Sequence, residues 1–171
     1  MRKILCALVV CLGALPAAFA DDALVKFKGG IAVIPVSSGV GTAPTAEVVN
    51  RNIVRGIQPP GQIWRISDLQ ATVRSDGRIS VRGKGLLLAG GNGIGTNANQ
   101  SVFATLICEA AAPFVLHSTN PAGVPLQPNG DFRIDDVLTP APGPTCASPV
   151  LLIRNLGGAW FAAGIEDLDD D

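Results

Sequence analysis

Residues 69–73 alternate between apolar and polar side chains, and residues 79–81 resume the alternation after the turn Ser75-Asp76-Gly77. A period of two is typical of a strand that buries one of its faces. Directly opposed residues of an antiparallel pair lie on the same face, so the apolar faces match only if the loop has three residues. The pattern therefore predicts a hairpin that sets Val73 opposite Ile79, with Gly77 at a loop position of positive φ.

A second turn of the same form, Pro128-Asn129-Gly130, stands between further apolar residues of matching phase. A three-residue loop at this turn pairs Leu126 with Phe132 and Val124 with Ile134. The glycine again occupies the left-handed position at the end of the loop. Two turns of one design predict a consistently antiparallel protein.

Other strands are expected wherever a short apolar or β-branched run stands between glycine- or proline-rich segments. Residues 150–154 and 159–165 form one such pair and predict a hairpin around 155–158. Residues 21–30 are expected to be a loosely ordered lead-in. The remaining expected strands are residues 31–36, 48–54, 102–108 and 114–118.

The alternation changes phase just before the first hairpin. Trp64 and Ile66 share a parity opposite to that of Leu69. An extra residue in one strand shifts the phase in this way. A β-bulge is therefore expected near Ser67 and Asp68.

Composition supports a protein built from strands and turns. The 171 residues include 20 Gly and 13 Pro, which is more helix-breaking residues than a helical bundle would carry. No segment combines a helical stripe with capping residues. We expect an all-β fold of about eight to ten short antiparallel strands. The first expected arrangement is a β-sandwich of the jelly-roll or Ig-like type, and the second is a small closed β-barrel. Its core should include Trp64, Phe103, Phe132, Trp160 and Phe161.

Residues 1–20 have the organisation of a secretory signal peptide. Arg2 and Lys3 precede the apolar run 4–15, and Ala18-Phe19-Ala20 fits a cleavage site with small residues at alternate positions. The run is shorter than the ~20 residues of a spanning helix, so no transmembrane segment is expected after cleavage. Residues 21–171 are expected to form a single β-rich domain with an acidic tail at 166–171. The protein is expected to be secreted, into a periplasm or out of the cell.

Cleavage after residue 20 leaves two cysteines, Cys108 and Cys146. An exported protein with one remaining pair is expected to form one disulfide. A metal pair or a catalytic thiol would need further cysteines or histidines nearby, and the sequence has one histidine. The bridge would tie the end of an apolar strand to the proline-rich connection 140–149.

Charge argues against one class of partner and indicates another. Residues 1–20 carry two cations and no acid, so cleavage changes the formal net charge from −1 to −3, and no nucleic-acid ligand is expected. Four cations nevertheless share the polar face of the first hairpin, where they could attract an acidic glycan, an envelope polymer or a protein partner. An ordinary solvated face that discourages edge pairing is the alternative interpretation. These candidate binding residues are Arg74, Arg78, Arg82 and Lys84.

The sequence offers little for catalysis or for a cofactor. His117 stands beside Ser118, but a Gly-x-Ser-x-Gly motif is missing, and the histidine is expected to be exposed at a strand end or in a loop. The acids within residues 131–136 lack the alternating spacing and glycine turn of a calcium loop. The glycine-rich loop 90–96 lacks the Gly-Lys-Ser/Thr ending of a phosphate loop. No catalytic residue, metal or cofactor is therefore expected.

We expect an exported, non-catalytic β-domain with a binding, adhesive or structural role at or outside the cell envelope. A secreted inhibitor or partner-binding module is one alternative, and it would need a rigid, partly apolar loop such as 90–99 or 140–149. A small secreted hydrolase with paired carboxylates is the other. That enzyme would need two acids that converge in a cleft, at least one of them with a raised pKa.

Overall fold

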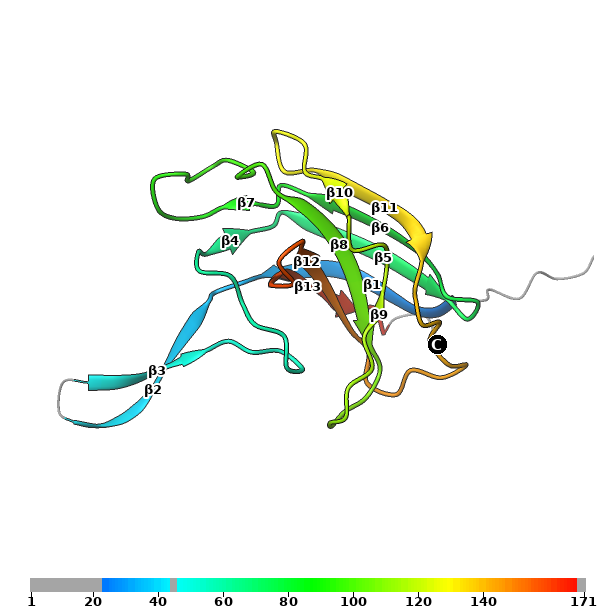
Figure 1. Ribbon diagram of the computed structural model, residues 1–171, viewed down its shortest axis with the longest axis horizontal. Helices are drawn as coiled ribbons and strands as arrows, with labels where there is room; N and C mark the ends of the chain where they lie inside the picture. Colours follow the sequence, from blue (N-terminus) through cyan, green and yellow to red (C-terminus); the bar gives the residue numbers. More distant parts are fainter. Residues whose placement is uncertain (1–22, 44–45, 169–171) are drawn as a thin grey trace, which may run out of the picture.

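The computed structural model describes residues 23–43 and 46–168, and every regular element within them is a β-strand (Figure 1). The predicted signal peptide and the last three residues of the acidic tail lie outside these ranges. The all-β prediction is confirmed. The strands are β1 (Ala23–Ala32), β2 (Val36–Ala43), β3 (Ala46–Arg51), β4 (Trp64–Arg65), β5 (Asp68–Arg74), β6 (Arg78–Lys84), β7 (Leu87–Leu88), β8 (Ser101–Ile107), β9 (His117–Ser118), β10 (Val124–Pro125), β11 (Phe132–Val137), β12 (Val150–Asn155) and β13 (Trp160–Glu166).

One antiparallel sheet has the strand order β10-β8-β12-β13-β1-β5-β6-β11, with β9 added beside β8. The sheet curls until its two edge strands, β10 and β11, lie close to each other (Figure 1). A bridge between Ser118 and Thr139 joins the two ends of the sheet at one point. The architecture is therefore a nearly closed barrel, the second of the two arrangements expected from the sequence.

The barrel has a seam between its edge strands β10 and β11, where no ladder of hydrogen bonds closes the sheet. β10 and β11 share no ladder, and a hollow of about 210 Å³ lies beside them, lined in part by Gly123, Val124 and Ile134. The backbone N–H of Asn120 donates to Oδ2 of Asp136 at 2.8 Å, and both residues line this hollow. Isolated contacts thus replace a continuous ladder at the seam.

The hairpin β5–β6 has the predicted register. Val73 lies opposite Ile79, and Asp68 lies opposite Lys84 at the other end of the ladder. The N–H of Gly77 donates to the carbonyl of Arg74 at 2.9 Å, and the φ of Gly77 is +85°. The predicted hairpin of β12 and β13 is also confirmed, with Gly158 in its turn at a φ of +84°.

The second predicted turn forms, but its hairpin does not. Gly130 has a φ of +82° and donates its N–H to the carbonyl of Gln127 at 2.8 Å. The N–H of Gln127 donates to the carbonyl of Asp131 at 2.9 Å and closes the three-residue loop, but no ladder continues beyond it, so the predicted pairs Leu126–Phe132 and Val124–Ile134 are wrong. Val124 pairs with Val102 of β8, whereas Phe132 and Ile134 pair with Gly83 and Val81 of β6.

Gly83 explains in part why β11 pairs with β6. A Cβ at Gly83 would lie 2.0 Å from Cε1 of Phe132, so the aromatic ring occupies the space that a side chain would fill. Phe132 is buried and belongs to the barrel core. The glycine in β6 therefore serves packing of the neighbouring strand.

β1 corrects the prediction of a loose lead-in at residues 21–30 and of a strand at 31–36. The strand occupies Ala23–Ala32 and lies between β13 and β5 within the sheet. Val25 and Phe27 are buried, while Lys26 and Lys28 alternate with them. The register to β13 shifts between Phe27 and Gly30. This irregularity interrupts the alternation of apolar and polar residues, so the sequence does not show the period of two that marks a strand.

The predicted β-bulge near Ser67 and Asp68 is wrong. Trp64 pairs with Leu88 in the short β4–β7 sheet, and Asp68 pairs with Lys84 in the β5–β6 ladder. Each strand advances by four positions from one of these pairs to the other, so neither strand contains an extra residue. Both strands leave the ladder together, where Gly85 has a φ of +66°. The change of phase therefore marks a gap between two sheets, without an extra residue.

The interior is filled mainly by aliphatic side chains with a few aromatic rings. Trp64 of β4 stacks on Phe161 of β13, with ring centroids 4.1 Å apart. β2 and β3 form a separate two-stranded arm that projects from the barrel (Figure 1). The prediction of five buried aromatic residues is confirmed for Trp64, Phe103, Phe132, Trp160 and Phe161.

Candidate functional site

The four cations predicted to share a face do so. β5 and β6 alternate strictly, with Leu69, Ala71 and Val73 among the residues turned into the core. The intervening positions point to the outside of the barrel. Arg74, Arg78, Arg82 and Lys84 are all exposed there.

Three further cations extend this surface and were missed by the sequence-based prediction. Lys26 and Lys28 come from β1, which pairs with β5, and Arg133 comes from β11, which pairs with β6. The register places Lys28, Gln70, Arg82 and Arg133 in one row across four adjacent strands. We call the whole surface the cationic face; it consists of Lys26, Lys28, Arg74, Arg78, Arg82, Lys84 and Arg133.

Acidic side chains neutralise only part of the cationic face. Asp76 lies 3.5 Å from Arg78, and Asp135 forms an ion pair with Arg133. The hydrogen bond from Arg133, followed by one from Ser80 Oγ at 2.8 Å, lowers the pKa of Asp135, and the same pairing raises the pKa of Arg133. Within the described part of the chain, Lys28, Arg74 and Arg82 take part in no such ion pair.

The cationic face is hollowed. One hollow of about 460 Å³ is lined in part by Lys26, Lys28 and Arg82, and another of about 580 Å³ is lined in part by Arg74 and Arg78. Thr72 and Ser80 line both hollows and are only partly exposed. Long cationic side chains therefore surround a shallow floor that carries two hydroxyl groups.

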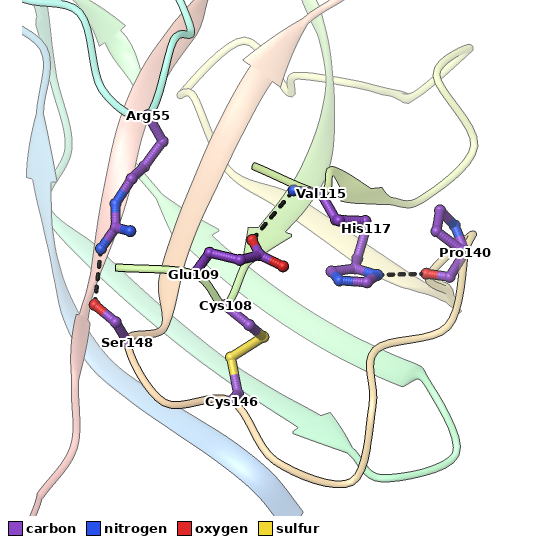
Figure 2. The surroundings of a disulfide bond; sticks show 8 residues. All are labelled: Arg55, Cys108, Glu109, Val115, His117, Pro140, Cys146 and Ser148. Atoms are coloured by element: carbon purple, nitrogen blue, oxygen red, sulfur yellow. Dashed lines mark hydrogen bonds between the residues drawn. A yellow bond between two sulfur atoms is a disulfide. The ribbon is translucent and has the colours of Figure 1, made fainter. Parts of the chain in front are cut away.

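The predicted disulfide is present at one end of the barrel. Cys108, just after β8, is bonded to Cys146 in the connection between β11 and β12 (Figure 2). The bond therefore joins a strand from one side of the barrel to the segment that leaves the other side. Such a bond is compatible with an oxidising compartment.

His117 corrects the prediction of an exposed histidine. It lies in β9, its residue surface is 7% exposed, and its Nδ1 lies 2.8 Å from the carbonyl oxygen of Pro140 (Figure 2). A carbonyl only accepts hydrogen bonds, so Nδ1 carries the proton. The neighbouring Ser118 hydroxyl bonds to the hydroxyl of Thr105 at 3.0 Å. The histidine thus has a structural partner, and the serine is bonded to a different group.

The two described acids with shifted pKa values, Glu109 and Asp135, are shifted away from the direction that the general acid of a carboxylate hydrolase needs. The pKa of Glu109 is lowered chiefly by the N–H of Val115, which donates to its carboxylate at 3.1 Å (Figure 2). Asp135 is shifted in the same direction. The general acid of such an enzyme requires a shift in the opposite direction.

The acids near residue 131 are held separately. Asp131 accepts the N–H of Gly85 at 3.0 Å, while Asp136 accepts the N–H of Asn120. In the ranges 23–43 and 46–168, no three His, Cys, Asp or Glu side chains gather as metal ligands would. The fold therefore uses these carboxylates to hold backbone segments.

The loop at 90–99 is held by hydrogen bonds to neighbouring segments and exposes one large apolar side chain. The N–H of Gly95 donates to the carbonyl of Leu88, and Nδ2 of Asn97 donates to the carbonyl of Leu126 at 2.9 Å. Ile94 is 65% exposed on this hydrogen-bonded frame. A single large apolar side chain is therefore presented to solvent on an ordered loop.

The described residues contain no helix that is long and apolar enough to cross a membrane. No protein-family model, no curated protein sequence and no solved structure matches the chain.

Proposed function

We propose that this protein is an exported, non-catalytic domain that binds an acidic polysaccharide through its cationic face. The observation that carries the proposal is the row of Lys28, Arg82 and Arg133, from β1, β6 and β11 with Gln70 of β5 between the first two. The row lies beside hollows lined by the hydroxyl groups of Thr72 and Ser80. The predicted signal peptide and the disulfide support a secreted location, in a periplasm or outside the cell.

The spacing of the cationic face suits a polymer better than a single small anion. Neighbouring strands lie about 4.8 Å apart, and outward residues of one strand follow each other at about 6.7 Å. One exposed ion pair contributes only about 0.2–1 kcal/mol. A ligand with repeated carboxylates gains from several such pairs at once, and its hydroxyl groups can bond to Thr72 and Ser80 on the floor.

Net charge makes the test sensitive. With residues 1–20 removed the protein carries a formal charge of −3, so its overall field repels a polyanion. Retention on polygalacturonate beads at low salt would therefore have to come from a local surface. We expect retention at low salt, loss of retention at about 0.5 M salt because of screening, and no retention on neutral dextran.

The decisive variant is Arg74→Glu/Arg82→Glu, which reverses two cations on neighbouring strands. We expect its affinity for polygalacturonate to fall at least about tenfold. Arg82→Glu is compared directly with Arg65→Glu, which makes the same change of charge at an exposed residue of β4 outside the cationic face. Equal retention of Arg82→Glu, Arg65→Glu and the unaltered protein would overturn the proposal.

A second candidate function is partner binding through the loop at 90–99, because Ile94 is exposed on an ordered loop. This alternative predicts a protein partner that is released by Ile94→Asp and retained by Arg82→Glu. Binding to polygalacturonate would follow the opposite pattern. The two variants therefore separate the two functions.

A further inference from the structure

One row of outward residues interrupts the cationic face. The register aligns Thr72 of β5, Ser80 of β6 and Asp135 of β11 across the sheet. Two of these side chains are uncharged hydroxyls, and the third is a carboxylate that is 50% exposed. We call these three residues the polar row.

Arginines stand on both sides of the polar row. Each of them lies two positions along its strand from a member of the row; they are Arg82 and Arg133 on one side, and Arg74 and Arg78 on the other. Outward residues of one strand follow each other at about 6.7 Å, so the two groups of arginines are about 13 Å apart. The acidic groups of a ligand therefore find their partners beside the polar row and not on it.

The polar row is open to a ligand between the two groups of arginines. Ser80 lines both the hollow of about 460 Å³, which it shares with Arg82, and the hollow of about 580 Å³. Asp135 lines the second of these hollows together with Arg74 and Arg78. A polymer that spans the two hollows must therefore pass over Ser80 and lie beside Asp135.

Hydrogen bonds determine what the polar row offers to such a polymer. Ser80 Oγ donates its proton to Oδ1 of Asp135 at 2.8 Å, and Nε of Arg133 donates to Oδ2 of the same carboxylate. A serine hydroxyl has one proton and two lone pairs, and a carboxylate oxygen accepts more than one hydrogen bond. Ser80 and Asp135 therefore present acceptors, and a ligand group that meets them must donate.

We propose that Ser80 and Asp135 select an acidic polysaccharide with free hydroxyl groups, by accepting hydrogen bonds from those hydroxyls while the flanking arginines bind its carboxylates. The inference rests on the proposed function and narrows the class of ligand. The charge of Asp135 also repels an acidic group that lies on the polar row, and such a repulsive element is a common source of specificity. A polyanion without hydroxyl donors meets this repulsion and gains no hydrogen bond in return.

The first test compares polygalacturonate with its O-acetylated form, which keeps the carboxylates and has its hydroxyl groups esterified. We expect the unaltered protein to prefer the unmodified polymer at least about fivefold, and Ser80→Ala to reduce the preference to about twofold or less. This variant removes an acceptor without changing charge. Ser75→Ala is the matched control, because this exposed serine lies in the turn of the same hairpin and lines neither hollow. It should keep the full preference.

The second test removes the charge of Asp135. Asp135→Asn should raise the affinity for both polymers through charge, but about threefold more for the acetylated one, because only the unmodified polymer loses a hydrogen bond. Asp76→Asn makes the same change of charge at an exposed acid beside Arg78, outside the polar row. It should raise both affinities by the same factor.

The outcomes separate this inference from the proposed function. Equal binding of the two polymers to the unaltered protein, or a preference that Ser80→Ala and Asp135→Asn leave intact, would overturn the inference. The proposed function would still stand if Arg82→Glu abolished retention on polygalacturonate. Retention of neither polymer would overturn both.

Discussion

The two sides of the barrel, β5–β6–β11 and β8–β12, differ in how much of their outer face is buried. In β5, β6 and β11, apolar residues turned into the core alternate with residues exposed to water. In β8, residues 102–107 are all buried, and β12 has three consecutive buried residues at 151–153. A strand with one wet face has an alternating sequence, whereas a strand covered on both faces has a continuous apolar one.

The two sides also treat polar groups differently. On the covered side, Thr105 is fully buried and its hydroxyl bonds to Ser118 of β9. Arg154 lies over the ring of Phe103, 5.1 Å from its centroid, and burial lowers the pKa of this arginine. On the wet side the cations stay exposed and can meet a ligand. We therefore expect ligand binding on the side of the barrel whose outer face is exposed to water.

Removing the disulfide should have the largest effect on stability, because it releases the connection between the two sides. The bond joins residues 38 positions apart, and the loop-entropy relation gives about 4 kcal/mol at this length. We expect Cys108→Ser/Cys146→Ser to lose about this much free energy of unfolding in urea titrations. The reduced, unaltered protein is the control and should behave similarly. A loss below about 1 kcal/mol would contradict the role of the bridge.

The second-largest effect is expected from shortening one side chain on each side of the barrel, because the covered side should lose more stability than the side exposed to water. Leu152 of β12 is fully buried, so Leu152→Ala should cost about 3 kcal/mol through lost burial and a cavity. Gln70 of β5 faces water, and Gln70→Ala should change the free energy of unfolding by no more than about 0.5 kcal/mol. Both values come from denaturant unfolding. Similar costs at the two positions would remove the distinction between a covered and a wet side.

The smallest expected effect is a change of pH dependence at Glu109. Its pKa lies below the usual 4.5 because the folded chain donates the Val115 N–H to the charged carboxylate. A lowered pKa in the folded state contributes stability above the unfolded pKa, and this stability is lost as the pH falls through the folded value. Between about pH 6 and pH 3, Glu109→Gln should therefore lose less stability than the unaltered protein.

Urea midpoints at several pH values measure the Glu109 effect. Glu166→Gln, at an exposed carboxylate of β13, is the matched control. If Glu109→Gln has the same acid dependence as the unaltered protein, then the Val115 contact does not stabilise the charged form.

Local patterns predict local structure in this chain, while the choice of partner strand depends on distant residues. The β5–β6 register follows from the alternation beside one turn. The turn at Gly130 is equally readable, but Val124 pairs with Val102 and Phe132 with Gly83, and both partners lie far from the turn in sequence. No local signal fixes that choice.

The same limit applies to the candidate site. Four of its cations lie on one predictable hairpin, whereas Lys26 and Lys28 join them only because β1 pairs with β5, more than forty residues later. The neighbours of His117 predict an exposed histidine at a strand end or in a loop, whereas the residue is buried beside the carbonyl of Pro140, 23 residues away. Burial that depends on a distant backbone group leaves no trace in the neighbouring residues.

The seam between β10 and β11 is the place where we expect the barrel to open locally most often. Along most of the sheet, separating two neighbouring strands breaks a ladder of several pairs. At the seam, separation breaks the Ser118–Thr139 bridge, the contact of Asn120 with Asp136 and the backbone bond from Gln127 to Asp131. We therefore expect the amide groups beside this seam to be among the first in the barrel to exchange their hydrogens with solvent.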